Sequence, residues 1–260
     1  MTPPGAASAV PALLRSRLER EPAAPPSESH PALSLDDAYG IQGALEQALV
    51  GRGERVIGWK VGLTNAAFQQ NWGLAEPVGA FMLGSGVFSS GDAIPTGRFV
   101  GLGVEIEIAF LLRADLAGPG VTPASAVLAV EGAMPAFELI DVRYAGKARG
   151  VDLVADGVYA NAIVLGRPLT PVGGLDLALE GMVYEENGQI AATATAAEVL
   201  GNPLVSLAWL ANAQARRGRS LRAGDVVMSG SISKIFRPKA GDSIRASFTR
   251  LGSVSCRFVG

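Results

Sequence analysis

The sequence is poor in the side chains that build disulfides and histidine-based sites. Its 260 residues include one cysteine, Cys256, and one histidine, His30. A lone cysteine excludes a disulfide framework within the chain, and the terminal apolar run around Cys256 indicates a buried thiol that packs as a small hydrophobic group. His30 stands between Ser29 and Pro31 with no glutamate three or four residues later, so no histidine-glutamate pair is available to activate water.

An excess of one charge and long apolar runs are also missing. The 22 basic residues nearly balance the 24 acidic ones, for a net charge of -2, which offers no electrostatic surface for nucleic acid. No apolar run reaches the roughly 18 residues of a membrane-spanning helix. The first residues lack the basic start and the apolar core of a secretory signal. We therefore expect a cytoplasmic protein that binds neither nucleic acid nor membrane.

The composition favours one main domain preceded by a different segment. Hydrophobic residues make up 48% of the chain, enough for one large core rather than two small ones. In the first 33 residues, seven prolines interrupt an alanine-rich stretch in which only residues 12–18 suggest a helix. We expect residues 1–33 to form a short helix and a loose arm suited to contacts between subunits. Residues 34–260 are then a single domain.

Within this domain, two segments carry helical patterns and many carry strand patterns. Ser34 and Asp37 form a capping-box-like start, after which apolar residues recur at helical spacing up to Gly51. Residues 203–217 show a second apolar face of helical period. Asn187-Gly188 between two apolar runs predicts a two-residue hairpin turn. Strands are expected over residues 56–64, 104–112, 136–142, 162–165, 182–184, 226–229, 244–248 and 254–259.

The most informative run is residues 104–110, where Glu105 and Glu107 flank one apolar residue among strong strand formers. At the two-residue period of a strand, both carboxylates project from one face. Like charges in a segment suited to burial destabilise each other unless a cation lies between them. Glu138 interrupts a second apolar run and is the natural third ligand. Three carboxylates favour a hard ion such as Mg²⁺ or Mn²⁺; the alternative is a sheet face that carries solvated acids.

Charged residues in two further apolar runs need an explanation. Lys60 is the single lysine of the run 56–64 and has glycines and a tryptophan nearby. It is either a lysine that extends to the surface or a cation placed for function. Asp141 and Arg143, two residues apart, share a face of an extended segment, and we predict that they form a structural ion pair.

Six segments together give these residues a family context. They are Gly58-Trp59-Lys60-Val61-Gly62-Leu63-Thr64, the pair Glu105 and Glu107, Ala136-Phe137-Glu138-Leu139-Ile140-Asp141-Val142-Arg143-Tyr144, Asp156 after Val154-Ala155, residues 200–203 running into 208–212, and residues 251–258. In this order they resemble the 2-keto-4-pentenoate hydratase, 2-oxohepta-3-ene-1,7-dioate hydratase and 4-oxalocrotonate decarboxylase group of the fumarylacetoacetate hydrolase superfamily. The resemblance implies an α+β fold over residues 34–260, a mixed β-roll around a metal site with peripheral helices.

The resemblance also implies an activity. Members of this group are divalent-metal-dependent lyases, hydratases or decarboxylases, that act on a 2-oxo-alkenoate or 2-hydroxydienoate of aromatic catabolism. Glu105, Glu107 and Glu138 would hold Mg²⁺ or Mn²⁺, which chelates the substrate's carboxylate and 2-oxo oxygen and stabilises a dienolate. Lys60 matches the family's active-site lysine and would add a positive charge or assist proton transfer.

Other expectations concern the substrate pocket and the assembly. Ser231 and Ser233 lie in a glycine-containing loop that can bind a substrate carboxylate, although an ordinary tight turn would have the same composition. Tyr159 replaces a small hydroxyl residue of the family pattern and is a candidate substrate-binding group and proton donor. The resemblance further implies a homo-oligomer, and a complex with a sister hydratase or decarboxylase is the other partner it suggests.

One departure affects the choice of reaction. Val78 stands where many hydratases of the group carry an aspartate, so a group that handles water or protons is missing. This favours decarboxylation slightly within the lyase class. Acylpyruvate hydrolysis is the runner-up function, disfavoured because His30 has no glutamate partner, and a non-catalytic metal-binding paralogue or partner subunit is the third.

Overall fold

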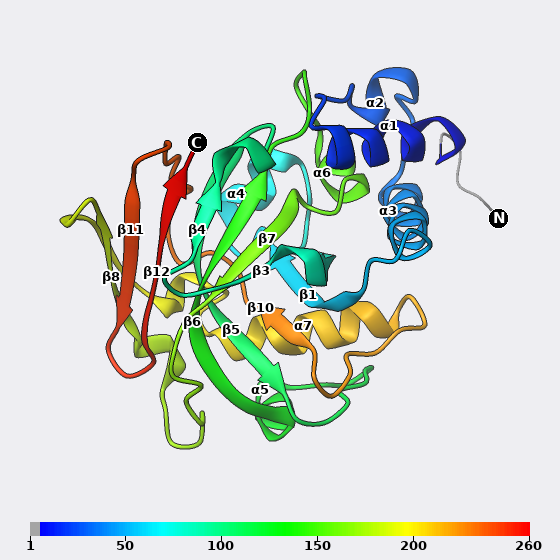
Figure 1. The fold of residues 1–260 in the computed structure, drawn as a ribbon. Coiled ribbons are helices and arrows are strands. Elements are labelled where there is room, and N and C mark those ends of the chain that lie inside the picture. Colours follow the sequence, from blue (N-terminus) through cyan, green and yellow to red (C-terminus); the bar gives the residue numbers. More distant parts are fainter. Residues whose placement is uncertain (1–5) are drawn as a thin grey trace.

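The computed structural model describes residues 6–260, which form seven helices and twelve strands with short 3-10 turns between them (Figure 1). The helices are α1 (Ala6–Glu19), α2 (Pro26–Ser29), α3 (Leu35–Val50), α4 (Ala66–Trp72), α5 (Pro123–Ala126), α6 (Gly150–Ala155) and α7 (Pro203–Ala215). The strands are β1 (Val56–Gly62), β2 (Val78–Leu83), β3 (Val87–Ser89), β4 (Ala93–Pro95), β5 (Leu102–Leu112), β6 (Val130–Asp141), β7 (Ala160–Leu165), β8 (Gly181–Glu186), β9 (Gln189–Thr195), β10 (Val226–Met228), β11 (Ser243–Phe248) and β12 (Gly252–Val259).

The strands form two sheets. The larger has seven strands in the order β2-β1-β10-β5-β6-β7-β3, and the smaller has five in the order β4-β12-β11-β8-β9. The long antiparallel pair β5 and β6 curves through the centre of Figure 1, with the five-stranded sheet on one side and α7 on the other. Parallel and antiparallel neighbours both occur in the larger sheet, so the predicted mixed α+β architecture is confirmed.

The core lies between these two sheets and under the helices. Phe137 of β6 meets Tyr184 of β8 edge-on with ring centroids 6.4 Å apart, and Tyr184 packs on Phe236 at 4.1 Å. Full burial of such a side chain stabilises the fold by about 2 kcal/mol. The same core continues under α1 and α3, where Leu13 and Leu45 are fully buried.

The predicted regular elements are largely confirmed. Ser34 caps α3, because its hydroxyl accepts from the Asp37 N–H while the Asp37 carboxylate accepts from the Ser34 N–H. Helix α7 begins with Pro203 directly after its capping residue, a favourable place for a proline. Asn187 and Gly188, with φ of 51° and 76°, connect β8 to β9 as a tight hairpin. Strand β2 was not predicted, because a fully buried strand shows no polar alternation.

The N-terminal segment packs closely on the rest of the chain. Helix α1 is longer than the predicted 12–18 segment and lies beside α3 (Figure 1). Further along, the N–H and hydroxyl of Ser27 donate to the Asp152 carboxylate at 2.7 and 2.6 Å. The division into an arm of residues 1–33 and a domain of 34–260, and the arm's contact with another subunit, remain predictions.

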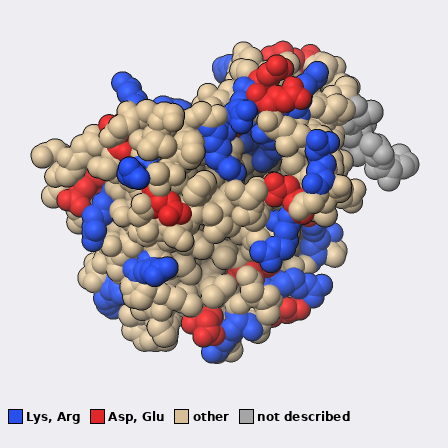
Figure 2. All heavy atoms as spheres, in the orientation of Figure 1, with Lys and Arg blue, Asp and Glu red and all other residues tan. Residues whose placement is uncertain are grey.

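Two global features bear on possible partners. In the part of the chain that the structure describes, no helix combines the length and apolar character needed to cross a membrane. Figure 2 shows that basic and acidic side chains occur together over the face in view, as expected from a net charge of -2.

Candidate metal and substrate site

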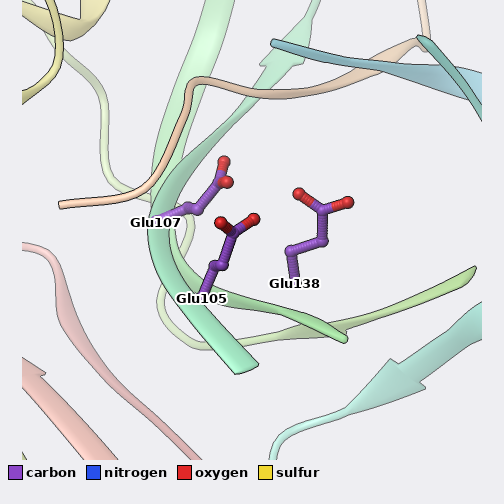
Figure 3. Close-up of side chains that lie close together, drawn as sticks. All are labelled: Glu105, Glu107 and Glu138. Carbon is purple, nitrogen blue, oxygen red and sulfur yellow. The ribbon is translucent and has the colours of Figure 1, made fainter. Parts of the chain in front are cut away.

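Two adjacent strands bring the three predicted acids together. Glu105 and Glu107 project from the same face of β5, and Glu105 lies directly opposite Glu138 in the antiparallel pairing with β6. Oxygen atoms from the three carboxylates all lie within 4.8 Å of one another. Figure 3 shows the three carboxyl groups directed into one space. The convergence expected from the two-residue spacing is therefore present.

Lys60 joins this cluster from β1. Its side chain is 2% exposed, and Nζ lies 2.7 Å from Glu138 Oε1 and 3.8 Å from Glu105 Oε2. Nζ also donates to the backbone carbonyl of Val158 at 3.1 Å. Lys60 is thus a buried cation, and its burial rules out the alternative of a lysine that extends to the surface.

Burial and charge together shift the pKa values of the cluster. Burial alone would lower the pKa of Lys60, but Glu138, Glu105 and Glu107 raise it above the ordinary value. Burial raises the pKa of Glu107 well above its usual range, and the neighbouring Glu138 and Glu105 add to this. Burial also raises the pKa of Glu138 to about 7, although Lys60 opposes the shift. Burial and mutual repulsion therefore disfavour the ionised carboxylates, and a further cation between them would stabilise the ionised forms.

The unsatisfied oxygens indicate what kind of cation fits. With all groups ionised, three glutamates and one lysine leave a formal charge of -2 in a largely buried site. Among the described residues, Glu107 Oε1 and Glu138 Oε2 are buried without a hydrogen-bond donor. Unpaired buried oxygens of this kind are costly. An ion of charge +2 that prefers oxygen ligands fits both the charge and the donor set.

The Ser229–Ser233 loop supports the acid cluster through its backbone. The Gly230 N–H donates to Glu107 Oε2 at 2.8 Å. Gly230 has φ of 115°, and a Cβ there would lie 2.5 Å from Thr64 side-chain atoms, so only glycine fits. The sequence suggested that this loop offers N–H groups to a substrate, and in the structure one of them is bonded to a glutamate.

A cavity of about 420 Å³ opens beside the acid cluster. Lys60 and Glu105 line one end, and the predicted substrate-binding residues Tyr159, Ser231 and Ser233 lie on its walls. The structure therefore brings the predicted site residues together, although Glu107 and Glu138, each 1% exposed, do not themselves line this cavity.

The predicted pocket residues already have partners of their own. Ser231 Oγ donates to the Ser233 carbonyl at 2.8 Å, and Ser233 Oγ donates to the Lys234 carbonyl at 3.1 Å. Burial, and then Asp156, raise the pKa of Tyr159. The phenol is accordingly a neutral hydrogen-bonding group, and its role as a substrate-binding group and proton donor stays a prediction.

Several cavity residues were not predicted. They come from separate segments that carry no local motif, and they are Phe68, Trp72, Lys147, Ile235 and Arg237. Apolar residues on a short helix and basic residues in loops usually contribute to packing or solubility, so the sequence alone gives no signal for them. Together they add apolar groups and two exposed cations to the lining of the cavity.

A second charged cluster lies beside the site and is structural. Arg143 Nη1 lies 3.4 Å from Asp141 Oδ2, which confirms the predicted pair. Arg143 also binds Asp156 through two hydrogen bonds of 2.9 and 2.6 Å. Asp141 Oδ1 in turn accepts from the N–H groups of Val100 and Gly101.

Residues 59–259 match the family described as fumarylacetoacetate (FAA) hydrolase C-terminal. The chain belongs to this family. It is 35% identical over 260 residues to 2-keto-4-pentenoate hydratase of Paraburkholderia xenovorans, covering 99% of this chain and 96% of that protein. It is 32% identical to 4-oxalocrotonate decarboxylase of Pseudomonas sp. strain CF600, covering 90% and 89%.

Among solved structures, the chain is similar to 4-oxalocrotonate decarboxylase from Pseudomonas putida G7 complexed with magnesium and adipate. The TM-score is 0.94 at 29% identity, with 98% of this chain and 97% of that chain covered. The fumarylpyruvate hydrolase of Pseudomonas aeruginosa shares the fold at a TM-score of 0.58 and 16% identity. The predicted family, fold and lyase class are confirmed by these relatives.

Proposed function

We propose that this chain is a divalent-metal-dependent lyase, a hydratase or decarboxylase, that acts on a 2-oxo-alkenoate or 2-hydroxydienoate of the aromatic-catabolism type in the cytoplasm. The observation that carries the proposal is a buried cluster of three carboxylates and one lysine with a formal charge of -2 at the end of a 420 Å³ cavity. The named activities of the relatives and the magnesium in the similar decarboxylase structure support the same assignment.

Glu105, Glu107 and Glu138 would hold Mg²⁺ or Mn²⁺. A divalent ion at these oxygens supplies Lewis-acid stabilisation of negative charge that develops on the substrate. The protein's contribution is a largely buried, negatively charged recess, formed by strands and supported by the Gly230 N–H. Rigid strands fix the spacing of the ligands, which pre-organises the site.

Lys60 would act on the substrate from the same end of the cavity. The surrounding glutamates raise its pKa, so its ammonium stays charged at neutral pH. A charged donor in a water-poor site can stabilise a developing oxyanion or deliver a proton to the reacting carbon. Tyr159, Ser231 and Ser233 line the walls and would contact the substrate beyond its 2-oxo acid end.

The remaining cavity suits an extended, conjugated substrate. Phe68, Trp72 and Ile235 provide apolar walls, and Lys147 and Arg237, which also line the cavity, would bind a distal carboxylate. The adipate complex of the similar decarboxylase, a six-carbon diacid, supports a substrate with two acidic ends. Val78, 1% exposed in β2, offers no group that handles water, which favours decarboxylation slightly over hydration.

The test is a turnover screen with Mg²⁺ or Mn²⁺ on a 2-hydroxydienoate, an oxalocrotonate-like diacid and an acylpyruvate. Water addition and carbon dioxide release are measured separately, and we expect one of them on the first two substrates. Acylpyruvate cleavage with neither lyase reaction would overturn the proposal. Metal binding without any turnover would identify a non-catalytic paralogue.

The assembly is the second part of the proposal. The family resemblance favours a homo-oligomer, and a complex with a sister hydratase or decarboxylase is the heteromeric alternative. Sedimentation of the chain alone, and then with a candidate sister enzyme, separates these assemblies. A monomer in both experiments would contradict this part.

A further inference from the structure

The loop between α6 and β7 has an unusual backbone. Gly157, Val158 and Tyr159 follow one another with φ of 82°, 54° and 57°. The left-handed region is unfavourable for residues with a side chain, most of all for a β-branched valine. Three consecutive residues in this region persist only when neighbouring groups hold them.

This loop carries two groups of the site. The carbonyl of Val158 accepts the hydrogen bond from Lys60 Nζ at 3.1 Å, and Tyr159 lines the cavity. Of the oxygens that contact Nζ, the Val158 carbonyl is the one that does not belong to a predicted metal ligand. The position of the Lys60 ammonium therefore depends on the backbone of this loop.

Arg17 of α1 spans the two ends of the loop. Its Nη1 donates to the Ala160 carbonyl at 3.0 Å, and its Nη2 donates to the Asp156 carbonyl. Asp156 and Ala160 are the residues that flank the three left-handed positions. A planar guanidinium presents its donors in a fixed fork, so Arg17 ties the two carbonyls together. Arg143 Nη2 adds a second bond to the Ala160 carbonyl, at 3.2 Å.

The surroundings of Arg17 are fitted to this role. The guanidinium lies over the ring of Phe81 at 5.6 Å from the centroid, and a Cβ on Gly157 would lie 2.9 Å from Nη2. Burial, and then the like charge of Arg143, lower the pKa of Arg17 to about 10. It still carries its charge at neutral pH, because the bonds to the loop, the Phe81 ring and the charges of Asp156 and Asp141 offset the cost of burial.

We propose that Arg17 is a positioning residue that holds the 157–159 loop in its left-handed conformation and, through the Val158 carbonyl, fixes the Lys60 ammonium in the site. This inference rests on the proposed function for the role of Lys60. It makes the N-terminal segment part of the active-site scaffold, although that segment is distant in sequence from every other site residue.

The test compares Arg17→Met and Arg17→Lys with Arg15→Met, an exposed arginine on the same helix. Arg17→Met should lower kcat by about tenfold or more, as expected for a displaced catalytic group, with little change in KM. Arg17→Lys should recover part of the loss, and Arg15→Met should behave as wild type. Metal-induced thermal stabilisation should be unchanged in all three, because the glutamates lie on β5 and β6.

A double-mutant cycle separates positioning from general destabilisation. If Arg17 acts through Lys60, Arg17→Met should cost nothing further in a Lys60→Met background. Equal losses in both backgrounds would overturn the inference. If Arg17→Met does not fold, the same cycle is run with Arg17→Lys.

Hydrogen exchange provides a readout that does not depend on activity. The Val158 and Ala160 N–H groups donate to Leu153 and Gly157 carbonyls at 2.8 and 3.0 Å, and both should exchange faster in Arg17→Met than in Arg15→Met. Unchanged exchange would refute the proposal even in an active enzyme. A wild type without turnover would refute the proposed function instead, and the exchange result would still decide whether Arg17 holds the loop.

Discussion

Replacing Glu107 by glutamine tests the metal centre most directly. The substitution keeps the size of the side chain, removes one of three predicted ligand charges, and changes the formal charge of the cluster from -2 to -1. Even groups outside the ligand set of a metal site typically change its affinity by about 10- to 100-fold. We therefore expect the affinity for Mg²⁺ or Mn²⁺ to fall by about 100-fold.

The expected loss of metal affinity can be measured as a smaller metal-induced shift in Tm. At a metal concentration of about 100 times Kd, binding stabilises the wild type by about 2.7 kcal/mol, and a 100-fold weaker variant gains only about 0.4 kcal/mol. For a chain of this length, about 1 kcal/mol moves Tm by roughly 2 °C. The metal-induced shift should fall from about 5 °C to about 1 °C by scanning fluorimetry.

Without metal, Glu107→Gln should fold at least as well as the wild type. The raised pKa of Glu107 gives the direction of this effect on the free energy of unfolding. A carboxyl whose pKa is raised on folding binds its proton more tightly in the folded state, so the free energy of unfolding falls as pH rises from about 4.5 toward the folded pKa. Glutamine does not titrate, so the variant does not lose free energy of unfolding in this way as pH rises. Glu131→Gln, an exposed acid on β6, is the control. A full metal shift in Glu107→Gln would refute the metal site.

Three further predictions concern the same site. Lys60→Met should lower turnover by roughly tenfold or more while the metal-induced thermal shift is retained; wild-type turnover would make Lys60 purely structural. Because burial raises the pKa of Glu138 to about 7 despite Lys60, metal affinity measured by calorimetry should weaken by about tenfold per pH unit below about 7, as one proton competes with the ion. A pH-independent affinity would contradict this. Arg237→Met and Lys147→Met should each raise KM by a few-fold for a diacid but not for a monoacid, since both cations are exposed and line the cavity; equal effects on both substrates would remove them from the site.

The acid cluster could be predicted from sequence because its signals are local. Glu105 and Glu107 share a face through the two-residue strand period, and both interrupt a run that otherwise suits burial. Glu138 needed one further assumption, that its strand pairs with theirs, and the observed register places it opposite Glu105. The capping box at Ser34 and the Asn187-Gly188 turn were predictable for the same reason, since their geometry is contained in two to four residues.

The rest of the site depends on contacts between distant segments. Arg17 reaches a loop about 140 positions away, with separations of 139 and 143 residues in its two hydrogen bonds. Lys147 and Arg237 meet at one cavity although nothing in their own segments marks them. The surroundings of Tyr159, where burial and then Asp156 raise its pKa, could not be read from its own segment either. Long-range packing decides all three cases.

The balance of charge explains why one buried cluster is a site and its neighbour is scaffold. Arg17 and Arg143 face Asp141 and Asp156, so that cluster is neutral, and both carboxylates of its aspartates have donors. A charge-balanced network whose carboxylates all accept hydrogen bonds needs no added cation. The glutamate cluster has a charge of -2 and two oxygens without donors in the described residues, so it is complete only when a cation binds. The loop from Asp156 to Ala160 belongs to both clusters, which is how the rigidity of the neutral one can be transmitted to Lys60 in the other.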